Sequence, residues 1–353
     1  MKMTPRERIL SALHKNKTDK IPWAAYPLLI PRGHVERKVR NKGCGILAYM
    51  PPWKMSMPDV TVAEKKVWDK RARATLIERT YVTPVGEVNE KAQIRVDLSP
   101  NKSQWIREYM IKDVSDYSVV KFMIENTSFS ADYDSFLEAE KELGEDGIVP
   151  ASAPPSPMQK MLKELMGVET FSIHAFEHRA EFKELAHLIA EKDDEVYRII
   201  ADSPAKLVMG GENVSGDVVS PRLFKEYSLP FYNRQGKLFH EKGKKYSIHM
   251  DGRHNCIKNL TKEADIDIVE SFTFPEGGGD LPFEEAQNLW KGKAIWANFP
   301  ASLCHESEEK IKAFLHRLTE KVGVEDGFLL ELSEDLPPVL WQRVMLIIAD
   351  VLG

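Results

Sequence analysis

Residues 206–252 contain the segment that decides the fold, KLVMGGENVSGDVVSPRLFKEYSLPFYNRQGKLFHEKGKKYSIHMDG. Its two ends, KLVMGGEN (206–213) and KYSIHMDG (245–252), are short apolar runs, and the stretch 221–243 between them has a helical pattern. A strand, a helix and a second strand in this order indicate a βαβ unit, whose two strands lie parallel in one sheet.

Six further apolar runs along the chain resemble these two. They are IPWAAYP (21–27), GILAYMPP (45–52), GIVPASAP (147–154), DIDIVESF (265–272), KAIWANF (293–299) and GFLLELS (327–333). Almost all are continuous rather than alternating, which is typical of parallel strands covered on both faces. Eight such runs predict an α/β fold, a closed (β/α)8 TIM barrel. A doubly wound open sheet is the alternative, but no GxGxxG motif follows an early strand to support it.

The N-terminal segment TPRERILSALHK (4–15) predicts a helix that covers part of this barrel. Thr4, Pro5 and Glu7 form a capping-box pattern with proline at the first helical position. Apolar residues then recur on one face of the segment, which is typical of an amphipathic helix.

The composition indicates a soluble globular protein. Of 353 residues, 42% are hydrophobic and 29% charged, and the net charge of −5 gives no general attraction to nucleic acid or to an anionic membrane. Three cysteines are too few for a disulfide framework, and no signal peptide or membrane span is apparent. We therefore expect a cytoplasmic protein.

One segment, residues 79–112, does not fit the barrel pattern. It combines the turn sequence TPVG with β-type alternation. We expect an inserted β-hairpin or small sheet between the second and third barrel strands, which covers one end of the barrel as a lid or partner surface. The basic stretch EKKVWDKRARA (64–74) is interpreted as a solvated helix face. No low-complexity linker divides the chain, so residues 1–353 are expected to form a single domain.

Polar side chains at the ends of the apolar runs are the candidates for the active site, because TIM barrels carry their sites at the carboxyl ends of the strands. They are Tyr26, Tyr49, Met50, Ser152, Glu212, Asn213, His249, Asp251, Glu270, Asn298, Glu331 and Glu334. Buried carboxylates are costly unless they are paired or bind a metal, so this composition points to chemistry rather than to packing.

His249 and Asp251 lie two residues apart at a strand end, so both side chains project to the same side. Such a pair can donate one nitrogen and one oxygen to a divalent metal, with Glu334 and Glu212 as the remaining ligands. The alternative is structural: a hydrogen-bonded histidine at the strand end and an aspartate that caps the next helix.

Several motifs resemble the uroporphyrinogen decarboxylase superfamily. They are TPRERILSALHKNKTDKIPW (4–23), TPVGEV (83–88), GENVSGDVVSPRLFKEYSLPF (211–231), HEKGKKYSIHMDG (240–252) and FLLELSEDLPPVLWQRV (328–344). The resemblance spans nearly the whole chain in the same order and implies the same barrel. The superfamily contains decarboxylases and also methyltransferases that exchange methyl groups with a corrinoid protein.

The resemblance to the methyltransferase branch is the better one. In place of the arginine-rich motif of the decarboxylases, this chain has YPLLIPRGHVER (26–37). Only Arg32 and Gly33 faintly resemble that motif. A substrate with many carboxylates needs several bidentate arginines. The thiol-methylating members bind zinc through His-x-Cys and a later Cys, and the matching positions here are His249, Asp251 and Glu334.

Replacing both thiolates by carboxylates leaves zinc more electrophilic, which suits polarisation of an ether oxygen. The resemblance thus implies a zinc-dependent O-demethylase that moves the methyl group of a methoxylated aromatic to the Co(I) of a corrinoid protein. His249, Asp251 and Glu212 are its expected catalytic residues. A decarboxylase-like lyase, a methylcorrinoid:thiol methyltransferase and a non-catalytic barrel that binds a tetrapyrrole are the alternatives.

Two further expectations concern what the protein binds. The substrate-contacting residues are expected to be Tyr26, Tyr49, Asn213 and Asn298. The corrinoid (cobalamin) arrives on a transient partner protein, neither nucleic acid nor membrane is a partner, and the sequence leaves open whether two copies of the chain form a homodimer.

Overall fold

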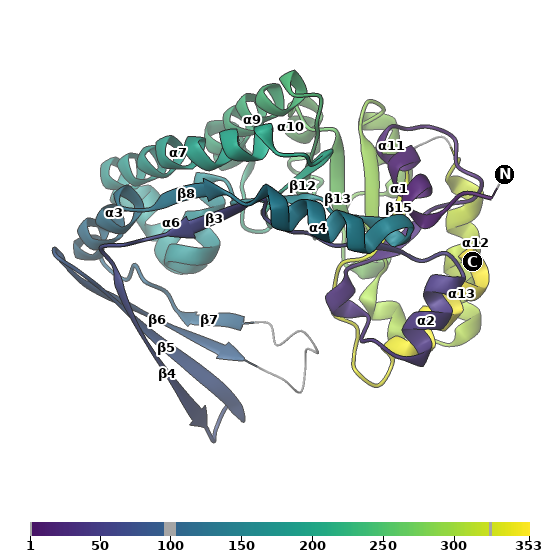
Figure 1. Ribbon diagram of the computed structural model, residues 1–353, viewed down its shortest axis with the longest axis horizontal. Helices are drawn as coiled ribbons and strands as arrows, with labels where there is room; N and C mark the ends of the chain where they lie inside the picture. The colour runs from purple at the N-terminus through teal and green to yellow at the C-terminus, as the bar shows by residue number, and fades with distance from the viewer. Residues whose placement is uncertain (1, 95–103, 325–326) are drawn as a thin grey trace. The chain divides into compact units, whose positions relative to one another are not determined.

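The computed structural model describes residues 2–94, 104–324 and 327–353 (Figure 1). The chain divides into two compact units. Unit 1 consists of residues 1–52, 133–152 and 204–353, and unit 2 of residues 53–132 and 153–203. That residues 1–353 form a single domain stays a prediction. Across the described residues, no helix is both long and apolar enough to span a membrane.

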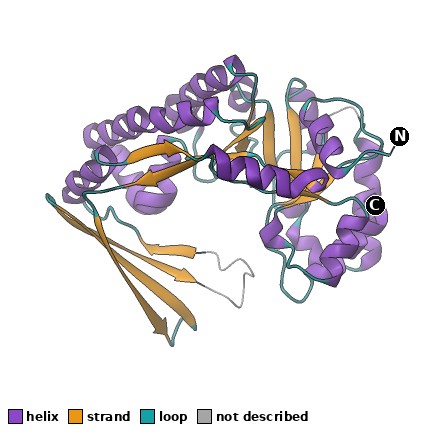
Figure 2. Cartoon of the chain, in the orientation of Figure 1, coloured by secondary structure: helices purple, strands orange, loops and turns teal. Residues whose placement is uncertain are grey.

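A curled sheet of nine strands, whose described pairings are parallel, forms the centre of unit 1 (Figure 2). In their order across the sheet the strands are β10 (Ala151–Ala153), β11 (Leu207–Gly210), β12 (Lys245–His249), β13 (Ile268–Thr273), β14 (Ala294–Asn298), β15 (Leu329–Leu332), β1 (Trp23–Ala25), β2 (Gly45–Leu47) and β9 (Gly147–Ile148). Every one of the eight apolar runs contributes to this sheet, and 147–154 supplies both β9 and β10. The fold is α/β and compatible with a TIM-like barrel.

Helices follow the strands of unit 1 along the chain. They are α1 (Pro5–Leu13), α2 (His34–Asn41), α4 (Tyr133–Leu143), α8 (Pro221–Leu223), α9 (Leu229–Glu241), α10 (Lys258–Glu263), α11 (Phe283–Leu289), α12 (Glu308–Lys321) and α13 (Trp341–Leu352). The predicted capping box at the start of α1 is confirmed, since Thr4 Oγ1 accepts from Glu7 N at 3.1 Å while Thr4 N donates to the Glu7 carboxylate at 2.8 Å. A π-helical turn (Phe224–Ser228) separates α8 from α9 just before Pro230, which lacks the N–H needed for a regular helix.

The apolar core of unit 1 lies inside the curl of the sheet. It is formed by buried side chains from α1 and from most of the strands: Ile9, Leu13, Ala24, Leu47, Ile148, Leu207, Ile268, Ala294, Trp296 and Leu329. Tyr26 and Tyr49 pack against this core from the ends of their strands.

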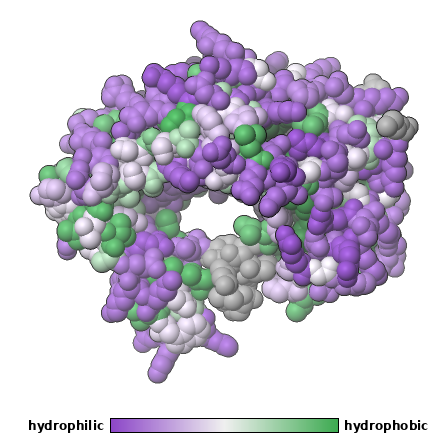
Figure 3. All heavy atoms as spheres, in the orientation of Figure 1, coloured by the Kyte–Doolittle hydropathy of each residue, from purple (hydrophilic) through white to green (hydrophobic). Residues whose placement is uncertain are grey.

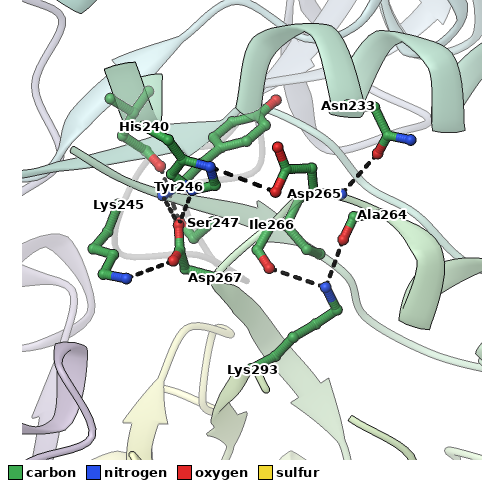
Figure 4. A network of polar contacts seen from close by, with 11 residues as sticks. Asn233, His240, Lys245, Tyr246, Ser247, Ala264, Asp265, Ile266, Asp267 and Lys293 are labelled. Carbon is green, nitrogen blue, oxygen red and sulfur yellow. Dashed lines mark hydrogen bonds and ion pairs between the residues drawn. The ribbon is translucent and has the colours of Figure 1, made fainter. Parts of the chain in front are cut away.

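A polar network joins the strands at their amino-terminal ends (Figure 4). Asp267, just before β13, accepts hydrogen bonds from Lys245 Nζ and His240 Nε2 at 2.7 Å each and from Tyr246 N at 2.9 Å. Lys293, just before β14, donates to the carbonyl oxygens of Ala264 and Ile266. These contacts join neighbouring strands at the end of the sheet that lies opposite to the predicted site.

The described residues of unit 2 form a four-stranded antiparallel sheet, a two-stranded sheet and four α-helices. The larger sheet has the order β4 (Thr61–Asp69), β5 (Ala74–Thr83), β6 (Gly86–Ile94), β7 (Gln104–Glu108), and the smaller one pairs β3 (Trp53–Ser56) with β8 (Ser128–Ala131). The helices are α3 (Tyr117–Glu125), α5 (Pro157–Lys160), α6 (Gly167–Glu177) and α7 (Arg179–Asp202).

The larger sheet differs from the predicted insert in extent. The predicted segment 79–112 includes part of β5 and all of β6 and β7, but residues 95–103 lie outside the described part of the chain. The prediction of a helix face over residues 64–74 is wrong, because β4 and the turn after it occupy this stretch. The many charges of this stretch are compatible with a strand at the edge of a sheet, because lysine is a common residue there.

Candidate functional site

Polar residues from several strands of unit 1 meet at the carboxyl ends of those strands. Glu270 on β13 is at their centre and has no exposed surface. Its Oε2 accepts from His249 Nδ1 at 2.6 Å, and its Oε1 accepts from the hydroxyl of Tyr26 and, at 3.5 Å, from that of Tyr49. One buried carboxylate therefore holds side chains that follow or end β1, β2 and β12.

The two tyrosines lie edge to face, with their ring centroids 5.0 Å apart. The pKa of each hydroxyl is raised well above its ordinary value, by burial and then by the negative charge of Glu270. Tyr26 and Tyr49 therefore keep their protons at neutral pH and act as hydrogen-bond donors.

A β-bulge in β13 positions this centre. The pairing with β14 shifts between Val269 and Phe272, and Ser271 has φ +61°, a left-handed conformation that is uncommon for a residue other than glycine. Ser271 N then donates to Glu331 Oε1 at 2.7 Å, and its hydroxyl pairs with that of Ser333 at 2.8 Å. The bulge thus connects β13 to β15 directly beside Glu270.

Glu331 on β15 is completely buried beside Glu270. Its pKa is raised well above the ordinary value because burial disfavours the charged form and because the negative charge of Glu270 lies close by. Burial and this neighbouring charge therefore favour the protonated form of Glu331.

The predicted metal ligands lie next to this centre. The amide of Asn213, oriented with its nitrogen toward Asp251, donates to both oxygens of that carboxylate. The pKa of Glu334 is raised by burial and by Asp251, against opposing effects of its hydrogen bond with Asn298 and of His249. The side chains of His249, Asp251 and Glu334 are thus close enough to influence one another electrostatically.

These residues do not form a preformed metal cage. Within the described ranges, no group of three or more His, Cys, Asp or Glu side chains is arranged to hold a metal ion. Glu212, two residues after β11, is buried, and its backbone N–H donates to Gly210 O at 2.7 Å. The metal assignment for His249, Asp251, Glu334 and Glu212 stays a prediction.

The predicted substrate contacts fall into two groups. Tyr26 and Tyr49 contact Glu270, whereas Asn213 contacts Asp251, and Asn298 accepts from Ser333 N at 3.1 Å and bonds Glu334. All four surround the same set of acidic residues, and their contact with a substrate stays a prediction. Sequence reasoning placed Glu270 and Glu331 among the candidates but assigned neither a role. The signal that marks them is a glutamate inside an apolar strand.

A comparison with protein families identifies this architecture. The family model for uroporphyrinogen decarboxylase (URO-D) matches residues 89–343. The chain belongs to the URO-D family. The resemblance inferred from the sequence motifs is thereby confirmed at the level of the family.

One solved structure shares the fold of this URO-D family member. A methyltransferase from Methanosarcina mazei aligns over 99% of this chain and 98% of its own with a TM-score of 0.57 and 12% identity, which shows a shared fold. A structure of Dispersin B aligns over 94% of this chain and 97% of its own at 10% identity, but its TM-score of 0.33 is too low to indicate a common fold. No curated protein sequence matches the chain significantly.

Proposed function

We propose that this URO-D family member transfers a methyl group from a methoxylated aromatic compound to the Co(I) of a corrinoid protein. The observation that carries the proposal is the Glu270 centre, in which one carboxylate orients His249 and two protonated tyrosines beside the buried Glu331, whose pKa is raised. Such a site offers tyrosine hydroxyls as hydrogen-bond donors, which suits an uncharged aryl methyl ether. The fold shared with a methyltransferase is consistent with this reaction.

The electron balance of the reaction defines what the protein must do. The methyl carbon forms a bond to cobalt with the electron pair of Co(I), and the pair of the broken C–O bond stays on the aryl oxygen. The resulting phenolate is stabilised by hydrogen-bond donors placed where its charge develops. Tyr49, whose bond to Glu270 is long at 3.5 Å, is the donor that can turn to this oxygen at the smallest cost.

Zinc fits the chemistry of the donor set. With Nδ1 bound to the Glu270 carboxylate, His249 has the partner that metal-ligating histidines have on their second nitrogen. The pKa of Glu334 is raised in part by the negative charge of Asp251. A bound cation would offset the repulsion between these two carboxylates. We infer that His249, Asp251 and Glu334 hold the ion after side-chain rotation, with Glu212 as a further ligand or support. Bound there, zinc would supply a Lewis acid for the ether oxygen.

We also infer that the sheet of unit 1 closes into an eight-stranded barrel. Its two outermost strands, β9 and β10, are separated in the chain by only Val149 and Pro150. A bridge from Met50 to Ala151 extends the pairing of the second strand across this break. Together β9 and β10 would form the third barrel strand, between β2 and β11.

Incubation with a panel of methoxyarenes, methylamines and methylthiols plus reduced corrinoid protein tests the proposed function. The cobalt spectrum should change from Co(I) to methyl-Co(III) only with methoxyarenes, and the His249→Ala variant should be folded but inactive. Metal analysis should find about one zinc per chain in the wild type. A metal-free chain that releases CO2 from a carboxylated ring would instead establish the decarboxylase-like alternative.

A further inference from the structure

Strand β4 at the edge of the four-stranded sheet is unusually exposed. Its neighbour in the sheet is β5, and eight of its nine residues are exposed. Three of them are large and apolar: Val62 is 45%, Val67 36% and Trp68 61% exposed. Figure 3 shows hydrophobic side chains interspersed with hydrophilic ones over this sheet. A long exposed edge strand with apolar side chains is a surface on which another strand can pair.

The sequence of β4, TVAEKKVWD (61–69), is complementary to itself when a second copy runs antiparallel to it and the two-fold axis passes through Lys65. In this register the opposed pairs are Thr61 with Asp69, Val62 with Trp68, Ala63 with Val67 and Glu64 with Lys66. Apolar residues face apolar residues and the charged pair has opposite signs. Such cross-strand pairs are the ones that stabilise antiparallel strands.

Neighbouring registers lose this complementarity. An axis moved by half a residue, to a point between Lys65 and Lys66, would oppose side chains that point to opposite faces of the sheet, so it gives no possible register. Moving it by a whole residue, to Lys66, opposes Glu64 to Trp68 and Lys65 to Val67. Only the axis at Lys65 opposes each apolar residue to another apolar residue.

The charges around β4 suit this arrangement. Glu64 Oε1 lies 3.4 Å from Lys66 Nζ of its own chain, and its Oε2 lies 3.0 Å from Arg79 Nε. A second copy would bring another lysine to this glutamate. The one pair of like charges, Lys65 with its copy, has Glu78 directly opposite on β5 in each chain.

We propose that two copies of this chain pair through β4, so that the two four-stranded sheets form one continuous eight-stranded sheet across a two-fold axis. This surface is independent of the site proposed for methyl transfer. An isologous contact of this kind uses the same strand from both copies and closes after two. Because one strand pair buries a small area, the dimer should dissociate on dilution.

Charge exchange on the full-length protein tests the pairing. The wild type should reach twice the chain mass of 40.3 kDa in concentration-dependent sedimentation. Lys66→Glu and Glu64→Lys should each stay monomeric. In a dimer of either variant, residues 64 and 66 would have like charges, and they face each other twice across the axis. An equimolar mixture of the two variants should dimerise again, because both pairs between positions 64 and 66 then have opposite signs. Circular dichroism of each variant checks that it is folded.

Cysteine cross-linking tests the register. In a Cys256→Ser background, which removes the one exposed cysteine of the described chain, Lys65→Cys should form a disulfide-linked dimer on mild oxidation. Lys66→Cys, one residue from the axis, should cross-link far less, since its copy lies on a diagonal. A monomeric wild type, a mixture that fails to dimerise, or stronger cross-linking through Lys66→Cys would each overturn the proposed interface.

Discussion

Glu270 is the residue on which the proposed site depends, because it contacts His249, Tyr26 and Tyr49 at once. Glu270→Gln keeps the shape but removes the charge that fixes the histidine, and methyl transfer should fall by about 10–100-fold. Glu331→Gln is the matched control, since burial already favours the neutral form of Glu331, and its rate should stay near that of the wild type. Steady-state rates at pH 7 distinguish the two, and an equal loss in both would contradict the roles assigned here.

Asp267 at the opposite end of the strands should make stability depend on pH. Burial raises its pKa, but the hydrogen bonds from Lys245, His240 and the Tyr246 backbone outweigh this effect, so the folded-state pKa lies below 3.8. Its contribution to stability is therefore fully present above the unfolded pKa and is lost as the pH falls through the lowered folded value.

Urea unfolding of Asp267→Asn measures this contribution. The variant should be less stable than the wild type by about 2 kcal/mol at pH 7, the magnitude of hydrogen bonds to a charged group. The difference should shrink as the pH falls through the lowered folded-state pKa, where the wild-type carboxylate becomes protonated. Glu320→Gln, at an exposed position of α12, controls for the loss of a negative charge. A difference that stays constant with pH would exclude the ionic contribution.

At the scale of the element, the bulge of β13 is the feature that brings Glu270 and Glu331 together. Ser271→Gly relieves the left-handed conformation and should leave Tm and activity close to those of the wild type. Ser271→Val places a β-branched residue at φ +61° in a buried position and should cost about 1–2 kcal/mol, or about 2–8 °C in Tm. Thermal unfolding followed by circular dichroism measures both variants. Equal Tm values for the two would show that the backbone conformation is unimportant.

At the scale of the whole molecule, the proposed reaction requires a second protein to present its corrin. Trp105 on β7 is 64% exposed with the Arg107 guanidinium 4.7 Å from its ring centroid, and it lies within the segment 79–112 that the sequence associates with partner binding. Trp105→Ser should lower the rate with the corrinoid protein by about 10-fold or more, the range of a buried interface aromatic. Its affinity for the methoxyarene should be unchanged in calorimetry. A wild type that methylates free cobalamin as fast as the protein-bound form would rule out this docking role.

The sequence by itself determined the α/β class, the positions of eight apolar runs and the family. Continuous apolar runs such as 206–213 and 245–252 are strong signals, because a buried strand needs apolar residues on both faces. The capping box at Thr4 could be predicted equally well, since its two partners lie only three residues apart in the sequence. Strand β4 was missed because a strand at the edge of a sheet tolerates the same charges as an exposed helix.

Only the tertiary structure decided which of the candidate residues act together. Glu270 and Glu331 are 61 positions apart and become neighbours through the pairing of β13, β14 and β15 and through the left-handed turn at Ser271. A sequence pattern has no signal for such a bulge, because its conformation is imposed by strands from elsewhere in the chain. The same holds for the raised pKa of Glu331, since it results from burial and from a neighbouring charge that folding alone brings close.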